Sequence, residues 1–394
     1  MRRLLLGFVL LILSTFFLAA QTYEAGMVYF DDHSLVEYRA GNLPIVISAP
    51  HGGYAEPDSI PDRDCSGCVY VRDSYTQELA REVEAAILER TGCYPHTVIN
   101  LLHRKKFDAN RDIGDAADGN TTVEEAWYDY HTFLDSAKAR VVAEYGRGLF
   151  IDLHGHGHTI QRIELGYTIS KSNLQLMDAE LNAEPFLTET SIRQLVVDNL
   201  EGHTHAELLR GEWAFGTLLE NDGFPAVPSL QDPFPLPNES YFSGGYNTRR
   251  HGSEDGGHID AIQVECNQDI RFDEDVRMVF ADSLASSLID YIDLHYLENF
   301  QEEACGLLIS NSPTLVHPEN RIALFPNPAR EVFHIETFGG TVEIRVCNQL
   351  GQPIFRVENP QGSLNISALP SGLYYVEAWE DGKRIAVEHL VVID

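Results

Sequence analysis

Positive charge is scarce in this sequence: 28 Lys and Arg residues stand against 60 Asp and Glu residues, which gives a formal net charge of −32. A surface this acidic repels polyanions, so nucleic acid is excluded as an expected partner. It also repels small anionic substrates, and a site for such a ligand has to gather its own cations. Any cluster of arginines in this chain is therefore informative.

Long apolar runs are absent except near the N-terminus, where residues 4–17 are almost entirely apolar. Arg2 and Arg3 precede this run, and Ala19 and Ala20 end it, which is the pattern of a secretory signal peptide. A membrane anchor is the alternative, but the run is shorter than the roughly 20 residues that span a bilayer. We expect an exported protein whose mature form has no transmembrane span.

Cysteine is also sparse, and the six cysteines include a single Cys-x-x-Cys pair, Cys65 and Cys68. A structural zinc site needs four ligands, and no second pair completes it, so we expect a local disulfide or free thiols. The sequence also lacks a Gly-x-Ser-x-Gly motif, which argues against a serine hydrolase with a nucleophile elbow.

Apolar strand-like runs alternate with amphipathic helical runs over residues 43–297. The predicted strands are residues 44–49, 97–102, 148–153 and 258–265, and the predicted helices are residues 73–91, 124–145, 205–219 and 273–296. This order predicts an α/β domain with a mixed or parallel sheet and with sites at the strand ends. We assign residues 1–20 to the signal peptide and residues 21–300 to this domain.

A second, smaller domain follows a predicted linker at residues 301–322. Residues 323–394 contain short alternating runs separated by Gly and Pro turns, which predicts a small all-β sandwich. Three motifs are Phe-Pro-Asn-Pro-Ala at 325–329, Asn-Gln-Leu-Gly-Gln at 348–352 and Leu-Pro-Ser-Gly-Leu-Tyr-Tyr at 369–375. Together they resemble the C-terminal sorting domain of type IX secretion cargo. The resemblance implies the type IX secretion machinery as a partner, followed by release or surface attachment; an adhesive or stabilising module is the alternative.

Histidines follow two of the predicted strands. His51 comes after strand 44–49 and precedes two glycines, which let a metal or ligand approach the backbone closely, although a structural histidine is the alternative. His154 directly follows strand 148–153, with Asp152 placed to orient it. His156 and His158 continue the alternation, but three such histidines cannot converge on one ion without a bend. We therefore expect one metal ligand among the three, His154.

Two acidic residues, Asp73 and Glu265, occupy positions at which a carboxylate could have either a structural or a chemical role. Asp73 opens helix 73–91, where it could cap the helix or bind a metal. Glu265 ends strand 258–265 between apolar neighbours, and its burial is costly unless it faces a metal, a cation or water.

Arginines gather in two segments of this acidic chain. Residues 103–112 follow a predicted buried strand, and an arginine there could hold a substrate carboxylate with two hydrogen bonds. A glycine-hinged loop at residues 241–252 carries a tyrosine and two further arginines. The candidate residues in the two segments are Arg104, Asn110, Arg111, Tyr246, Arg249 and Arg250.

These clusters together resemble the N-formylglutamate amidohydrolase family over residues 45–273. The motifs, in order, are Pro-His-Gly-Gly at 50–53, the aspartate at the start of helix 73–91, Asp-Ala-Asn-Arg at 108–111, Asp-Leu-His at 152–154, Gly-Gly-Tyr at 244–246 and Gln-Val-Glu-Cys-Asn at 263–267. The resemblance implies a phosphorylase/hydrolase-like fold similar to that of zinc carboxypeptidases. It also implies a Zn²⁺ cofactor bound by His51, Asp73 and His154. The carboxypeptidase His-x-x-Glu spacing is missing, because Tyr54 is three residues after His51, so Glu56 and Asp62 stay open as acidic ligands.

The resemblance further implies metal-activated water, with Glu265 as general base and Arg104 stabilising the oxyanion. Asn110, Arg111 and one of Arg249 or Arg250 would hold the carboxylates of a small anionic N-acyl amino acid or peptide substrate. N-formyl-L-glutamate is the reference substrate, and another N-acyl amino acid, a γ-glutamyl polymer or a peptide C-terminus fits an exported enzyme. A surface binding or adhesion protein built on a hydrolase-like scaffold is the alternative function.

Overall fold

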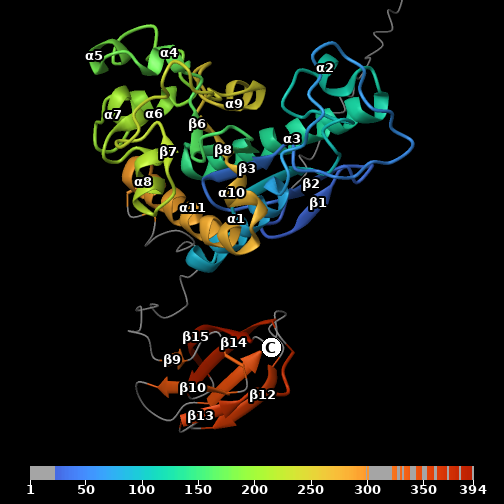
Figure 1. Ribbon diagram of the computed structural model, residues 1–394, viewed down its shortest axis with the longest axis vertical. Coiled ribbons are helices and arrows are strands. Elements are labelled where there is room, and N and C mark those ends of the chain that lie inside the picture. The colour runs from blue at the N-terminus through green and yellow to red at the C-terminus, as the bar shows by residue number, and fades with distance from the viewer. Residues whose placement is uncertain are drawn as a thin grey trace, which may run out of the picture. The chain divides into compact units, whose positions relative to one another are not determined.

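The computed structural model describes residues 23–298, residue 300 and eight segments of the C-terminal part, namely 322–325, 329–330, 332–337, 343–347, 353–358, 362–370, 372–380 and 383–392. The predicted signal peptide and residues 301–321 of the predicted linker lie outside the described residues. The chain divides into two compact units, residues 1–310 and 311–394, which are described separately (Figure 1). The exact bounds of the four predicted segments stay predictions.

An eight-stranded mixed sheet organises the first unit. In spatial order it contains β1 (Val28–Phe30), β2 (Val36–Arg39), β4 (His96–Asn100), β3 (Ile45–Ala49), β5 (Gly148–Gly155), β8 (Ile259–Cys266), β6 (Ile163–Gly166) and β7 (Ala226–Val227). The four central strands, β4, β3, β5 and β8, run parallel, whereas β2 and β6 pair antiparallel on either side of them. The predicted mixed α/β fold is thus confirmed.

Helices cover both faces of the central strands, which explains why those strands are almost fully buried. On one face, Ile47, Ile151 and Ile262 belong to the same core as buried residues of α1 (Thr76–Thr91) and α11 (Glu274–His295). On the other face, Val46 and Phe150 pack in a core with α3 (Thr121–Tyr145). Figure 1 shows α1 and α11 side by side along the sheet, with α3 on its other side.

Because side chains alternate between the two faces of a strand, the order of residues in β5 and β8 determines which face of the sheet carries their polar side chains. The apolar residues of β5 and β8 that face α1 and α11 alternate with Asp152, His154, Gln263 and Glu265, which therefore share the α3 face. These four residues lie in the second half of their strands, at the carboxyl ends of parallel neighbours. This is the edge of a sheet where sites in α/β folds form.

Most predicted elements are found within three residues of their expected ends, but one is wrong. The single helix predicted over residues 205–219 is two helices, α7 (His205–Arg210) and α8 (Phe215–Asn221). Gly211 ends α7 in an extended conformation, and a side chain there would lie 2.5 Å from the carbonyl oxygen of Glu207. The helix predicted from Asp73 begins only at Thr76, so Asp73 is not its cap.

Several short elements were not predicted. They are the strands β1, β2, β6 and β7 and the helices α2 (Ile113–Ala117), α4 (Lys171–Leu174), α5 (Asp178–Leu181), α6 (Arg193–Val197), α9 (Tyr246–His251) and α10 (Gln268–Phe272). Among the described residues, no helix is both long and apolar enough to cross a bilayer. Cys65 and Cys68 form a disulfide, in agreement with one of the two expectations for this pair.

The second unit is built from antiparallel strands, as predicted for its small all-β fold. One sheet contains β13 (Gly362–Asn365), β10 (Val332–Thr337) and β9 (Ile322–Phe325); the other contains β12 (Pro353–Glu358), β11 (Glu343–Cys347), β14 (Gly372–Glu380) and β15 (Lys383–Val392). Side chains from both sheets, including Phe333, Ile344 and Val376, share one apolar core.

Candidate functional site

Three side chains predicted as metal ligands meet at the carboxyl edge of the central strands. His51 Nδ1 lies 3.3 Å from Asp73 Oδ2, and His154 Nδ1 lies 3.2 Å from the same oxygen. All three residues are buried, and their ligand atoms lie within 4.8 Å of one another. We call His51, Asp73 and His154 the first cluster.

The local backbone explains how these residues reach one point. His51 lies two residues beyond β3, and its carbonyl oxygen accepts the backbone N–H of Asp73 at 3.0 Å, which joins the two loops. Gly52 allows this close approach, because a side chain there would lie 2.5 Å from the backbone nitrogen of Gln77. The backbone N–H of Gly155, at the end of β5, donates to Asp73 Oδ2 at 3.2 Å. The loop after β3, the segment before α1 and the end of β5 thus meet at the carboxylate of Asp73.

Each imidazole of the first cluster is held on its outer nitrogen by a second carboxylate. His51 Nε2 lies 2.6 Å from Asp108 Oδ1, and His154 Nε2 lies 2.9 Å from Asp152 Oδ2. Burial alone would raise the pKa of both aspartates, but the charges of the neighbouring imidazoles and their hydrogen bonds hold it below the usual range. An ionised carboxylate on Nε2 holds the ring proton there, so a neutral imidazole at either position would present the Nδ1 lone pair to a cation. Without a cation, the contacts with Asp152 and Asp73 raise the pKa of His154 despite its burial.

This donor set fits a zinc-type ion. Two neutral imidazoles and one carboxylate are the ligands of many catalytic zinc sites. With metal–ligand bonds of about 2.0–2.1 Å, neighbouring corners of a tetrahedron lie about 3.3–3.4 Å apart. The two Nδ1···Oδ2 distances of 3.3 and 3.2 Å are close to this spacing. In metal sites, the ring N–H of a histidine that points away from the metal typically donates to a carboxylate, as the Nε2 atoms of His51 and His154 do here.

Glu265 lies next to the first cluster. It is the parallel sheet partner of His154, and its Oε1 accepts a hydrogen bond from Gln263 Nε2 at 2.9 Å. Burial, together with the charges of Asp73 and Glu164, raises the pKa of Glu265 to about 8, although His154 and Arg104 oppose the shift. A buried carboxyl group with a perturbed pKa beside a candidate metal site is a candidate general base.

Arg104 contacts two carboxylates at the first cluster. Its Nε donates to Asp108 Oδ2 at 3.0 Å, and one terminal nitrogen donates to Asp73 Oδ1 at 3.3 Å. These contacts place a guanidinium beside the metal candidates, and the predicted role of Arg104 in stabilising an oxyanion stays a prediction. The two other acidic candidates are elsewhere: Glu56 pairs with Lys105 at 2.6 Å, and Asp62 pairs with Lys106 at 2.8 Å. The placement therefore favours Asp73.

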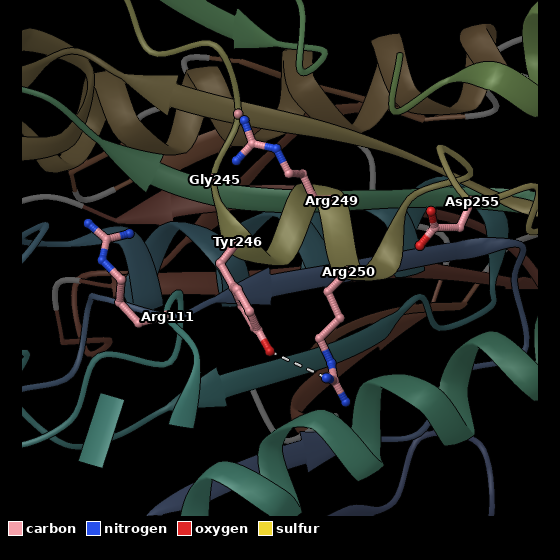
Figure 2. Close-up of a pocket in the computed structure, with 7 residues that line it drawn as sticks. Arg111, Gly245, Tyr246, Arg249, Arg250 and Asp255 are labelled. Atoms are coloured by element: carbon pink, nitrogen blue, oxygen red, sulfur yellow. Dashed lines mark hydrogen bonds between the residues drawn. The ribbon is translucent and has the colours of Figure 1, made fainter. Parts of the chain in front are cut away.

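The predicted substrate-binding arginines surround one pocket of about 510 Å³ (Figure 2). Figure 2 shows Tyr246 between Arg111 and Arg250, with Arg249 directed to another side of the same short helix. Arg250 donates to the hydroxyl of Tyr246 at 3.4 Å, and its guanidinium lies 5.1 Å from the ring centre of Trp127. The remaining lining residues are Gly244, Gly245 and Asp255.

Asn110 connects this pocket to the first cluster. Its side chain is buried, with Nδ2 3.2 Å from His154 Nε2 and with Oδ1 accepting the backbone N–H of Asn247 at 2.7 Å. A side chain at Gly245 would lie 2.5 Å from the amide nitrogen of Asn110, so the pocket loop packs directly on it. The amide oxygen is thus engaged within the protein, and the predicted contact of Asn110 with substrate stays a prediction.

Sequence reasoning missed Asp108, Gln263 and Glu164. The signal for Gln263 was its position two residues before Glu265 on a strand, which puts both side chains on the same face. Asp108 lies in a loop, and nothing in the sequence pattern paired it with His51. Glu164 lies on β6, a strand that was not predicted, and it is the antiparallel sheet partner of Glu265.

Comparisons with known proteins found one matching family model and several distantly similar solved structures. Residues 323–393 match the family described as the secretion system C-terminal sorting domain. The crystal structure of N-formylglutamate amidohydrolase from Ralstonia eutropha JMP134 is 13% identical, with a TM-score of 0.40, and the match covers 66% of this chain and 98% of that chain.

Two other solved structures are similarly distant. A gene product from Agrobacterium tumefaciens is 13% identical, with a TM-score of 0.39 and coverage of 66% of this chain and 95% of that chain. A candidate metallopeptidase from Shewanella amazonensis SB2B is 12% identical, with a TM-score of 0.29 and coverage of 66% and 82%. A search of curated protein sequences finds no match. Likenesses this distant do not assign a function.

Proposed function

We propose that this protein is an exported, zinc-dependent amide hydrolase that acts on small anionic N-acyl amino acids or peptides. The observation that carries the proposal is the first cluster with its surroundings. His51, Asp73 and His154 offer three ligand atoms, Asp108 and Asp152 hold the outer nitrogens of the two imidazoles, and a buried carboxyl group lies alongside. A purely structural site has no need of that additional carboxyl group.

Zinc held by the first cluster would supply Lewis acidity, which makes water a nucleophile near neutral pH and polarises an amide carbonyl. The chain's own residues provide the proton transfers. Gln263 holds Oε1 of Glu265 at 2.9 Å and so fixes the orientation of the carboxyl group, while Oε2 is left to accept a proton from water. The pKa of Glu265 falls from its raised value once the neighbouring residues hold a cation, toward the neutral range in which a general base is most effective. The same group then returns the proton to the leaving nitrogen.

Charge complementarity indicates the class of substrate. In a chain with a net charge of −32, Arg111, Arg249 and Arg250 line one pocket. Guanidinium groups bind carboxylates with two parallel hydrogen bonds, so the pocket suits a ligand with at least one carboxylate. Arg104, which reaches Asp73 and Asp108, adds positive charge where the amide oxygen would develop negative charge. N-formylglutamate, other N-acyl amino acids, γ-glutamyl chains and peptide C-termini all meet these requirements.

The location of the enzyme follows from the second unit. Because residues 323–393 match a secretion system sorting domain, we infer that type IX secretion carries the protein across the outer membrane and leaves it secreted or attached to the cell surface. Sorting and chemistry are then divided between the two units, with the first cluster and the arginine pocket in the first unit.

The test separates metal binding from proton transfer in the zinc-loaded full chain. His51→Ala should reduce the zinc content by one ion per chain and abolish hydrolysis of N-acyl amino acids and γ-glutamyl peptides. Glu265→Gln should retain the ion but lower turnover by roughly 10²–10⁴, because an amide keeps the shape and cannot accept the proton. The exposed Glu274, changed to Gln, is the matched control and should leave both quantities unchanged. Full activity of Glu265→Gln, or unchanged zinc content of His51→Ala, would overturn the proposal.

A further inference from the structure

A second group of potential metal ligands lies close to the first cluster and shares no residue with it. The members are His156, His158 and Glu164, whose ligand atoms also lie within 4.8 Å of one another. The two histidines are in the loop that follows β5, and Glu164 is on β6. His156 and Glu164 are buried, whereas His158 is partly exposed and could admit an ion from solvent.

In the part of the chain that the structure describes, no Lys or Arg side chain forms an ion pair with Glu164. Its Oε2 accepts the backbone N–H of Phe242 at 2.8 Å, and its Oε1 lies 2.7 Å from His158 Nδ1. Among the described residues, the only ion pair of Glu164 is with His158, which carries charge only when it is protonated. Glu164 is 1% exposed, and an ionised carboxylate buried this deeply is costly unless a cation compensates it. A divalent ion bound to Glu164 and His158 would supply a positive charge to this buried carboxylate.

The imidazole of His156 is arranged as a metal ligand would be. Its Nε2 lies 2.8 Å from the carbonyl oxygen of Arg162, which can only accept, so the ring proton is on Nε2. The lone pair is then on Nδ1, which accepts the backbone N–H of His158 at 3.1 Å, a contact that a stronger ligand bond could replace. A histidine whose outer N–H donates to a backbone carbonyl is the usual orientation in metal sites. The rings of His156 and His158 lie 5.0 Å apart.

Sheet register places this group beside the proposed general base. Glu265 on β8 is opposite His154 on β5 and opposite Glu164 on β6. Residues opposite each other on neighbouring strands point to the same face, so the three side chains form one row across the sheet. Glu265 therefore lies between a ligand of the first cluster and a carboxylate of the second group. Phe242, which Glu164 holds and which stacks on His158 at 4.7 Å, begins the segment that leads to the arginine pocket.

We propose that His156, His158 and Glu164 bind a second divalent transition-metal ion, of the class that takes imidazole and carboxylate ligands, such as Zn²⁺. This site is independent of the proposed catalytic zinc. It fastens the loop after β5 to β6 and to Phe242, on the side of Glu265 that faces away from the first cluster.

The experiment counts zinc ions per chain after chelation and equilibrium dialysis of the full chain against a zinc buffer, with plasma emission as the readout. The wild type should hold two ions. Glu164→Gln should hold one, and so should His158→Phe, which retains a ring to stack on Phe242. His51→Ala should also hold one, and the double variant His51→Ala/Glu164→Gln should hold none. The control is His33→Ala, because His33 forms a similar 2.8 Å pair with Glu125 outside both groups and its loss should leave two ions.

The outcomes distinguish this inference from the proposed function. One ion in the wild type that His51→Ala removes, and that neither Glu164→Gln nor His158→Phe affects, overturns the second site and leaves the catalytic proposal intact. An ion lost in Glu164→Gln and in His158→Phe but kept in His51→Ala supports the second site and overturns the first. Thermal unfolding of each variant confirms that the chain is folded before its ions are counted.

Discussion

Replacing Asp108 by asparagine tests whether this buried carboxylate prepares His51 for metal binding. Asp108 Oδ1 lies 2.6 Å from His51 Nε2, and Oδ2 accepts a hydrogen bond from Arg104 at 3.0 Å. Asparagine keeps the shape but has one oxygen and one NH₂ group. Whichever way it is oriented, the NH₂ group faces a donor, either the N–H of His51 or the guanidinium of Arg104. The substitution therefore misaligns the imidazole or removes one of the two carboxylates that pair with Arg104.

The size of the effect follows from the role of such carboxylates. Loss of a group that orients a metal-bound histidine typically weakens metal affinity by about 10–100-fold, which corresponds to about 1.4–2.7 kcal/mol. Stability should fall as well, by about 1.5–3 kcal/mol, because one hydrogen bond to a charged group is lost while Arg104 keeps Asp73 as a partner. Zinc affinity must accordingly be measured on folded protein at low temperature, by competition with a chelator of known affinity.

A matched control separates metal affinity from stability. Asp260 is as deeply buried as Asp108 and accepts hydrogen bonds from Ser253, Tyr296 and the backbone of Gln194, with no histidine among these partners. Asp260→Asn should lower stability and leave zinc affinity unchanged. If folded Asp108→Asn binds zinc as tightly as the wild type, Asp108 does not orient His51 for metal binding. The role that we give to Asp108 and Asp152 would then be wrong.

Three further predictions concern other parts of the chain. Arg111→Lys should weaken binding of a free-acid substrate by about 1.5–3 kcal/mol but hardly affect its amidated form, and equal losses of kcat/KM would contradict this. A chain without residues 323–394 should keep its turnover but stay in the periplasm, which fractionation and assays of the purified enzyme would check. Burial lowers the pKa of His96 from 6.5 to about 3, so its contribution to stability is complete above pH 6.5 and declines below it by about 1.4 kcal/mol per pH unit until about pH 3. Urea unfolding between pH 5 and 7.5 should show a smaller slope in His96→Gln.

The parts of the fold that the sequence predicted are those with strong local patterns. β3, β5 and β8 are rich in apolar residues because helices cover both of their faces, and α3 and α11 show the helical period over many residues. The break between α7 and α8 was missed, because a single glycine inside an otherwise helical pattern does not by itself reveal a turn. The short edge strands have too few residues to show a period.

The candidate site likewise contains residues that local sequence patterns indicate and residues that only tertiary contacts bring together. His51 and His154 could be proposed because each comes at the end of a recognisable strand. Asp73 was favoured only through a family resemblance, since its path to the cluster depends on the backbone contact with His51. The group formed by His156, His158 and Glu164 could not be foreseen, because it depends on the antiparallel register of β6 against β8, and register across a sheet is not a local property of the sequence.

The strand order of the first unit also determines at which stage of folding the proposed zinc ligands come together. β3 and β5 are neighbours in the sheet, yet 81 residues separate Asp73 from His154, and β8 with Glu265 is made later still. A nascent chain that has not yet added β5 offers only His51 and Asp73, which are too few to retain an ion. Contacts between residues so distant in sequence form late in folding, and binding at such a site is coupled to completion of the fold. If the first cluster binds zinc as proposed, the ion would be drawn from the compartment in which folding ends.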